Sequence, residues 1–344
     1  MLRLSILDQS PISKGSDARQ ALKQTKQLVQ LAEELGYTRF WVAEHHSTSG
    51  LASTSPEVLI SHLATSTEQI RIGSGGVLLP QYSPYKVAEN FKLLEALFPN
   101  RIDLGVGRSP GGGETIRLAL TDGNKKNLME FPRQLADLQG FLDEDLPKDH
   151  PYRTIKTSPA IDTLPETWVL GLSRRAAKHA AANSTGFTYG HFINPEYGQE
   201  AAEKYLSSFQ ASERMPEPKI NACIFVVCAD TQQEAEDLAL SQDLWLLAVE
   251  KGRSTQIVSV EEAKQTPLSK DDEKRIEENR KRTVIGTPDY VKETLQQFSK
   301  RYQTDEIMVI TNIYDAEKKR RSYKLLADAF RLQPRTASPH HSTI

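Results

Sequence analysis

The fold is decided by Gly73-Ser74-Gly75-Gly76-Val77-Leu78-Leu79-Pro80, by the amphipathic segment after it, and by Arg101-Ile102-Asp103-Leu104-Gly105-Val106-Gly107-Arg108. The two quoted stretches are typical of buried strands, and the segment opened by Ser83-Pro84 has the apolar spacing of a helix. A strand–helix–strand order predicts a βαβ unit, and such units build parallel sheets. Functional residues in these sheets follow the carboxyl ends of the strands, so the glycines and Arg108 are candidates for a site.

The same alternation extends over the whole chain. Strands are predicted at residues 2–7, 40–43, 70–79, 102–106, 168–171, 187–190, 220–228 and 306–310, with helices between most of them. Eight strands separated by helices favour a closed barrel over an open doubly wound sheet, and no Gly-x-Gly-x-x-Gly follows the first strand. We therefore predict an α/β protein, a (β/α)8 TIM barrel that forms one domain over residues 1–332.

Two long segments interrupt this alternation. The first covers about residues 109–166 and contains three consecutive glycines, and the second covers about 250–285 and is rich in charges of both signs. Loops of this length in a compact domain usually cover a site or bind a ligand. We expect both to be insertions at the carboxyl rim of the barrel, and residues 333–344 to be a disordered tail.

Composition limits the function classes. The 344 residues are 38% hydrophobic and 26% charged, with a net charge of -2, which gives no electrostatic argument for binding nucleic acid or an anionic membrane. No apolar run approaches the roughly 20 residues of a membrane helix, and the N-terminal residues predict a strand instead of a signal peptide. Cys223 and Cys228 lie an odd number of positions apart on one predicted strand, so their thiols should face opposite ways and stay free. The predicted compartment is the cytoplasm.

Glu44-His45-His46 follows the second predicted strand and is the candidate for acid–base chemistry. Histidine titrates near neutral pH and can relay a proton. Because adjacent side chains on a strand point in opposite directions, one histidine should enter the barrel; alternatively, one packs and the other caps the next helix. A metal site would also need His191 and Asp8, but no ligand spacing supports it, and we predict no metal.

Arg108 and the turn Gly171-Leu172-Ser173 are candidates for binding an anion. An arginine can form paired bonds with a phosphate, and the turn opens a helix whose first N–H groups attract anions. Ordinary capping by Ser173 beside two solvated arginines explains the same turn. The choice between the two stays open at this point.

Gly75-Gly76 lies within a predicted strand, which glycine normally weakens. The pair therefore indicates a bulge or a close approach of the backbone, and a cis peptide bond would be one such feature. A layer of the barrel interior that needs small residues is an equally good explanation.

Together, these segments resemble the bacterial luciferase-like family of flavin-dependent monooxygenases. The resemblance covers nearly the whole chain and rests on six segments in order: Ala43-Glu44-His45-His46, Gly75-Gly76-Val77-Leu78-Leu79-Pro80, Val87-Ala88-Glu89, Arg101-Ile102-Asp103-Leu104-Gly105-Val106-Gly107-Arg108, Trp168-Val169-Leu170-Gly171 with Ala176-Ala177, and Ile285-Gly286-Thr287-Pro288. The chain looks most like oxidoreductases of unassigned substrate in this family. Gly107 stands where the luciferase α subunit carries a reactive cysteine, so the chain is not equated with luciferase.

The resemblance implies a barrel that binds reduced FMN at its carboxyl rim and oxidises a small organic substrate with molecular oxygen. A separate flavin reductase would supply the reduced FMN. His45, beside Glu44, would handle a proton near the flavin ring, and Gly75-Gly76 would carry a cis peptide against that ring. Arg108 and Gly171-Leu172-Ser173 would bind the phosphate, although many relatives have a second hydroxyl where this chain has Leu172. The second long segment would be a mobile lid, and a homodimer is expected.

Three alternatives remain from the sequence. A deazaflavin (F420)-dependent oxidoreductase would share the fold and transfer hydride without oxygen. A flavin-binding protein that has lost catalysis would also fit. A metal-dependent hydrolase would use Glu44, His45, His46 and His191.

Overall fold

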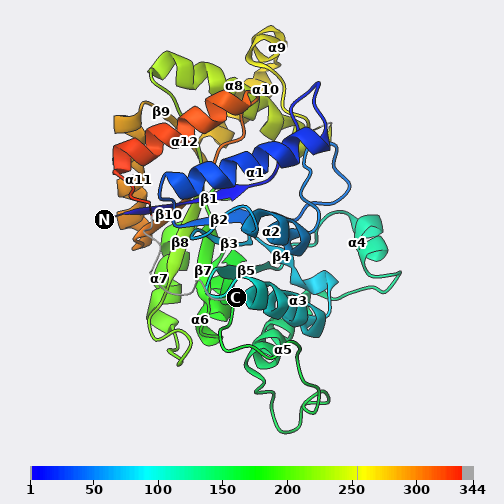
Figure 1. Ribbon diagram of the computed structural model, residues 1–344. Coiled ribbons are helices and arrows are strands. Elements are labelled where there is room, and N and C mark those ends of the chain that lie inside the picture. The colour runs from blue at the N-terminus through cyan, green and yellow to red at the C-terminus, as the bar shows by residue number, and fades with distance from the viewer. Residues whose placement is uncertain (1, 254, 335–344) are drawn as a thin grey trace.

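A closed barrel of parallel strands forms the centre of the computed structural model, which describes residues 2–253 and 255–334 (Figure 1). Its strands are β1 (Arg3–Asp8), β2 (Arg39–Val42), β3 (Arg71–Ser74), β5 (Ile102–Gly107), β6 (Glu166–Gly171), β7 (Gly186–Gly190), β8 (Ile220–Cys228) and β10 (Glu306–Ile310). The barrel closes because β10 pairs with both β1 and β8. The predicted (β/α)8 barrel is confirmed.

Helices cover the outside of the barrel. They are α1 (Ala18–Glu34), α2 (Pro56–Ala64), α3 (Pro84–Leu97), α6 (Arg174–Ala182), α7 (Gly198–Ser208), α11 (Pro288–Tyr302) and α12 (Ala316–Phe330). Each presents an apolar stripe to the sheet; on α1 the buried residues include Ala21, Leu28 and Val29. In Figure 1, α1 and α12 lie side by side across the β10–β1 junction.

The third predicted strand is divided, which corrects the prediction of one strand over residues 70–79. β3 ends at Ser74, and β4 (Val77–Leu78) follows, leading into the short 3-10 helix η1 (Leu79–Gln81). The Gly75–Gly76 peptide bond between them is cis, as the resemblance implied. β4 still pairs with β5, so the sheet continues past the interruption.

The two long segments contain more regular structure than predicted. The first holds α4 (Glu114–Leu120), η2 (Leu128–Glu130) and α5 (Phe131–Asp143). The second follows α8 (Gln232–Glu250) and holds α9 (Val260–Gln265), α10 (Lys270–Arg280) and β9 (Thr283–Gly286), which pairs with the end of β8. A capping box between Ser269 and Asp272 opens α10 despite its highly charged sequence. The predicted tail lies almost entirely outside the described residues, and the division into one domain over 1–332 stays a prediction.

The interior of the barrel is filled by large side chains. Trp41 and Trp168 meet edge to face with 5.5 Å between ring centroids. At the amino end, Arg39 forms ion pairs with Asp103 and Glu306 at 2.8 and 2.7 Å. Within the described residues, no helix is both long and apolar enough to cross a membrane.

The two cysteines behave as the strand alternation predicts. Cys223 packs inside the barrel with Trp41 and Phe225, whereas Cys228 packs in the layer between the barrel and the helices. Both thiols are buried and free.

Candidate functional site

Glu44 follows β2 and connects three neighbouring groups. Its buried carboxylate accepts hydrogen bonds from the Leu78 N–H at 2.8 Å, the Tyr82 hydroxyl at 2.5 Å and His46 Nε2 at 2.7 Å. Burial and the bond to Glu44 raise the pKa of Tyr82, so its hydroxyl remains a donor. Both oxygens of Glu44 are therefore engaged within the protein.

His45 differs from its neighbour His46. Its Nδ1 is buried and has no hydrogen-bond partner among the described residues. Burial, with a smaller contribution from His46, lowers the pKa of His45 to about 4, so the ring is neutral at pH 7. A neutral imidazole has one donor and one acceptor nitrogen, and an unpaired buried nitrogen calls for an explanation. His45 is therefore the member of this pair whose ring has a buried nitrogen without a partner among the described residues.

The packing around Gly75 and Gly76 explains why both positions lack a side chain. A Cβ on Gly75 would lie 2.7 Å from Leu7 Cδ1, and a Cβ on Gly76 would lie 2.7 Å from the Gly105 carbonyl oxygen. Tight packing thus accounts for the glycines, and the peptide bond between them is cis, so the structure agrees with both explanations drawn from the sequence. At Gly107, by contrast, a Cβ would meet only the Ser109 nitrogen at 3.9 Å, so space remains at the carboxyl end of β5.

Arg108 follows this open position and is exposed, and its side chain forms no hydrogen bond or ion pair with any group in residues 2–253 and 255–334. It lies close enough to α6 to act on His179: burial first, and then the charges of Arg108 and Arg175, lower the pKa of that histidine. Positive charge therefore accumulates beside α6 without a carboxylate that pairs with Arg108.

The turn that opens α6 has the geometry of an ordinary helix start. Ser173 is the N-cap, and its Oγ accepts a bond from the Ala176 N–H at 3.4 Å. A Cβ on Gly171 would lie only 2.2 Å from Ala176 Cβ, so glycine lets β6 and α6 approach. The side chain of Leu172 packs toward Gly190 of β7. Because the first turn contains no acidic residue, its dipole and the N–H groups other than that of Ala176 remain available to an anion.

His191 and Asp8 do not join the histidines that follow β2. The His191 ring bonds to the Tyr302 hydroxyl at 2.7 Å and packs against Phe298 of α11, and burial lowers its pKa to about 4. The Asp8 carboxylate accepts bonds from Lys319 and Thr25, both at 2.6 Å. The constellation that a metal-dependent hydrolase would need is therefore not assembled.

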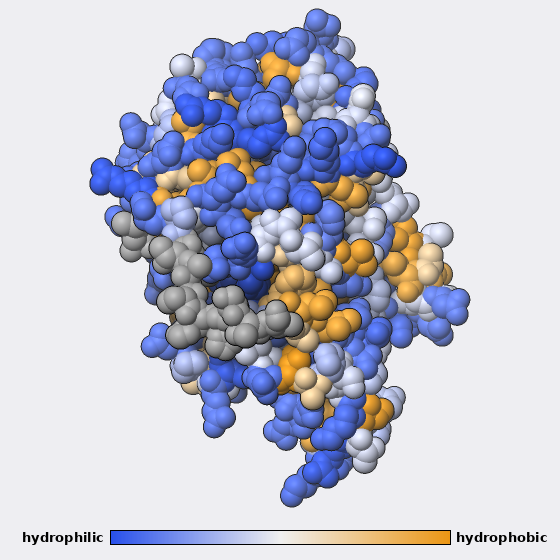
Figure 2. Space-filling model, in the orientation of Figure 1, coloured by the Kyte–Doolittle hydropathy of each residue, from blue (hydrophilic) through white to orange (hydrophobic). Residues whose placement is uncertain are grey.

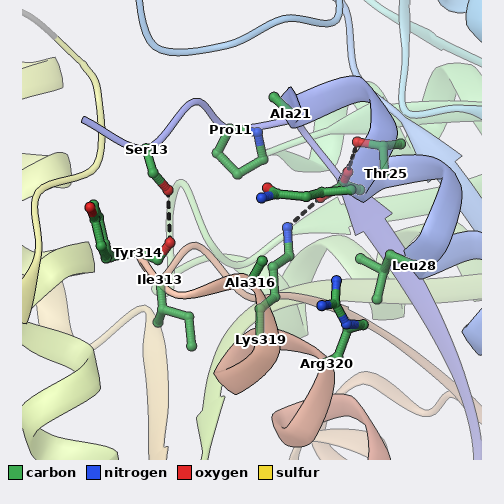
Figure 3. A pocket seen from close by; sticks show the side chains of 12 residues that line it. Pro11, Ser13, Ala21, Thr25, Leu28, Ile313, Tyr314, Ala316, Lys319 and Arg320 are labelled. Atoms are coloured by element: carbon green, nitrogen blue, oxygen red, sulfur yellow. Dashed lines mark hydrogen bonds and ion pairs between the residues drawn. The ribbon is translucent and has the colours of Figure 1, made fainter. Parts of the chain in front are cut away.

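Figure 3 shows the surroundings of Asp8, between α1 and α12. Lys319 points into this pocket, and a further bond joins Ser13 Oγ to the Tyr314 carbonyl at 2.7 Å. The cavity has a volume of about 20 Å³, which is room for about one water molecule. This pocket is too small for a flavin or an organic substrate.

The sequence did not identify two features at the barrel mouth. Residues 255–257, here called the strap, are bonded to the loops after β1 and β2: Thr255 Oγ1 lies 2.7 Å from Thr48 Oγ1, and the Ile257 N–H donates to the Ile12 carbonyl at 3.0 Å. Trp245 of α8 packs against Phe225 inside the barrel. Ile257 is an apolar residue within a polar segment, which indicated a buried contact. The sequence could not show where that contact lies, because the partners are more than 200 residues away.

Comparison with known proteins identifies relatives over almost the full length. The model of the luciferase-like monooxygenase family matches residues 2–304. The uncharacterized protein YceB of Bacillus subtilis (strain 168) is 56% identical over 96% of this chain and 100% of its own length. The N-acetyl-S-alkylcysteine monooxygenase of the same organism is 39% identical over 96% of this chain and 98% of its own.

Solved structures agree with these relatives. The structure of apo-MsnO8 has a TM-score of 0.89 and 35% identity, covering 97% of this chain and 100% of that one. Two more distant structures share the fold: the oxygenating constituent of 3,6-diketocamphane monooxygenase in complex with FMN (TM-score 0.71, 20% identity, 96% and 97% covered) and an F420-dependent secondary alcohol dehydrogenase (TM-score 0.60, 13% identity, 95% and 98% covered).

Proposed function

Because the chain belongs to the luciferase-like monooxygenase family, we propose that it uses reduced FMN and molecular oxygen to oxidise a small organic substrate. A separate flavin reductase supplies the reduced FMN. Two observations support a phosphate-bearing flavin: Arg108 is unpaired and its charge reaches His179 of α6, and the first turn of that helix contains no acidic residue.

In this proposal the phosphate lies against the first turn of α6. The N–H groups of that turn, the Ser173 hydroxyl and the Arg108 guanidinium bind it, while Leu172 contributes its backbone only. Gly171 is required because α6 packs so closely on β6. The residues present therefore fit a flavin phosphate without the second hydroxyl found in many relatives.

Gly75-Gly76 and the open end of β5 at Gly107 would hold the ring of the flavin. Bound reduced FMN supplies the electrons that activate oxygen. His45 holds its neutral ring ready to exchange a hydrogen bond or a proton through Nδ1, and Glu44 fixes the adjacent loop. An anion next to His45 would favour its protonated form and raise its pKa from about 4.

An F420-dependent oxidoreductase is the second candidate, because a structure of that class shares the fold. FMN is preferred because the neighbour in complex with FMN superposes better and the more similar relatives carry monooxygenase names. Loss of catalysis in a flavin-holding protein is the third candidate. The location in the cytoplasm is part of the same proposal and is supported by two buried, unpaired thiols.

The proposed assembly is a homodimer formed through α2 and α3. These helices expose Val58, Leu93 and Leu97, which are 68%, 53% and 57% accessible. Figure 2 shows apolar surface in the region of α3 amid hydrophilic surroundings. Apolar surface of this kind often marks a contact between chains. Light scattering tests this: we expect a dimer for the natural chain and a monomer for Leu93→Glu, and a natural monomer would contradict the assignment.

Binding of reduced FMN under anaerobic conditions tests the function. Losing one charge-assisted bond costs about 1.5–3 kcal/mol, so Arg108→Ala should weaken reduced FMN binding about tenfold or more. Binding of riboflavin, which lacks the phosphate, should not change. Arg19→Ala, an exposed arginine on α1, is the matched control.

Each other result has a definite meaning. An equal loss of FMN and riboflavin affinity would place Arg108 away from the phosphate. Tighter binding of F420 than of FMN would favour the second candidate. Tight flavin binding without oxygen consumption in the presence of substrates would favour the third candidate, and no flavin binding would refute the proposal.

A further inference from the structure

A second cavity lies between α8, α9 and α10, outside the barrel. Its volume is about 190 Å³. The apolar part of its lining consists of Leu240, Leu244, Ala263, Leu268 and Ile276. An apolar cavity of roughly 150 Å³ in another protein is large enough to bind benzene, so this volume accommodates an aromatic ring or a short alkyl chain. From this geometry we propose that the cavity is a binding site for a small, uncharged, apolar molecule.

Ion pairs around the cavity fix its three walls. Arg275 of α10 bonds to Glu250 of α8 at 2.7 and 2.9 Å, and Lys264 of α9 bonds to Asp237 of α8 at 2.8 Å. Lys251 pairs with Asp272 close by. These bonds join both short helices to α8 on either side of the apolar lining. They hold the walls in place around the cavity.

The charged residues of the lining offer no partner to an anionic ligand. Arg280 is paired with Asp243 at 3.0 and 2.7 Å and with Glu236 at 2.7 Å, which neutralises its charge. Glu273 lies on the exposed side of α10. No unpaired cation among the described lining residues is therefore available for a carboxylate or phosphate, and burying an unpaired charge against the leucines would be costly.

Part of the apolar lining is in contact with solvent. Leu268 is 37% exposed, and Leu244 and Ile276 are half-buried. Figure 2 shows apolar surface among hydrophilic residues at the end of the molecule where Figure 1 places α9 and α10. Covering apolar surface is favourable by about 25 cal/mol per Å², which is the driving force for occupancy.

The cavity and the apolar cluster inside the barrel are distinct sites, although α8 contributes residues to both. Leu240 and Leu244 line the cavity, whereas Trp245 and Leu246 of the same helix belong to the cluster inside the barrel. The helix thus separates the two sites. Occupancy of the cavity does not depend on flavin, so it is measured without any cofactor.

Fluorobenzene binding to the full-length chain, followed by fluorine NMR, is the test. We expect saturable binding to the flavin-free protein, with 4-fluorobenzoate binding about tenfold more weakly or not at all. Leu268→Trp places a ring in the cavity from its open side and should weaken fluorobenzene binding about tenfold or more. Val249→Trp adds the same bulk to an exposed apolar position of α8 outside the cavity and should leave binding unchanged.

Competition and a second variant complete the test. Ala263→Leu fills the cavity from α9 and replaces Leu268→Trp if circular dichroism shows that the latter is unfolded. Reduced FMN should not displace fluorobenzene. The proposal would be overturned if FMN displaces fluorobenzene, or if a folded cavity-filling variant binds fluorobenzene as tightly as the natural chain. Preference for 4-fluorobenzoate, or binding that does not saturate, would also overturn it. None of these results depends on the enzyme being active, so failure here is distinguishable from failure of the proposed function.

Discussion

Gly105 and Gly107 lie two residues apart on β5, on the same side of the strand, yet replacing each by alanine should have different consequences. A Cβ on Gly105 would lie 2.1 Å from the Ser74 carbonyl oxygen, a backbone atom that cannot rotate away. A Cβ on Gly107 would meet only the Ser109 nitrogen, at 3.9 Å. The pair therefore compares a closed position with an open one in the same element.

The magnitude for Gly105→Ala follows from three contributions. The Ser74 carbonyl must move by about 1 Å, and overpacking of this kind costs about 1–3 kcal/mol. The shift also disturbs the two bonds between Ser74 Oγ and the Gly105 backbone, at 2.8 and 3.0 Å, each worth about 1 kcal/mol. Reduced freedom of the unfolded chain offsets about 0.4–1 kcal/mol. The net expectation is a loss of about 2–4 kcal/mol, a large share of the 5–15 kcal/mol typical of native proteins.

Urea unfolding of the natural chain and the two variants measures this difference. We expect a lower midpoint for Gly105→Ala with an unchanged slope, and a midpoint for Gly107→Ala within about 0.5 kcal/mol of the natural chain. Equal midpoints for the two variants would show that the predicted clash with β3 does not determine stability. A large loss for Gly107→Ala would show that the space at the end of β5 is not open.

Three other variants test the buried polar groups. Glu44→Ala should lower the free energy of unfolding by about 2–4 kcal/mol, because the buried Leu78 N–H loses its partner, while Tyr82→Phe should cost about 1 kcal/mol; similar urea midpoints would exclude the proposed positioning role. For His191, the folded pKa of about 4 lies below the ordinary value of about 6.5, so the unfolded chain binds the extra proton first as the pH falls. The contribution of neutral His191 to the free energy of unfolding is fully present above pH 6.5. As the pH falls from 6.5 to 4, up to about 3 kcal/mol of that free energy is lost. The pH dependence of unfolding should accordingly be weaker in His191→Gln, and an unchanged slope would contradict the burial argument.

The barrel was predictable because its strands are continuous apolar runs separated by capped helices. The predicted strands at 220–228 and 306–310 match β8 and β10 in full. β9 was not predicted, since Thr283–Gly286 is short and follows a highly charged helix. It forms a strand because β8 extends past Cys223, the last residue that β7 pairs with, and β9 pairs with residues 225–228. Such a pairing depends on tertiary contacts that local pattern does not contain.

The candidate site was predictable in its residues and less so in their roles. Glu44, His45 and Arg108 were selected because they follow parallel strands, and the structure places them at the carboxyl ends of β2 and β5. The sequence could not show that both oxygens of Glu44 accept hydrogen bonds, because the donors Leu78 and Tyr82 lie more than 30 residues further along the chain. The roles of the site residues in binding and catalysis remain predictions.

The two ends of the barrel treat their polar groups differently, and this difference indicates what a ligand must supply. At the amino end, the Arg39 guanidinium is bonded to Asp103, Glu166 and Glu306, a saturated arrangement that contributes stability. At the carboxyl end, Arg108 and His45 Nδ1 lack partners in the described part of the chain. Leaving the buried His45 nitrogen unpaired costs about 1–3 kcal/mol, which folding alone does not recover, whereas the exposed Arg108 is solvated. A ligand that brings a hydrogen-bonding group to His45 and an anion to Arg108 would satisfy both groups, and the proposed flavin ring and phosphate would supply them.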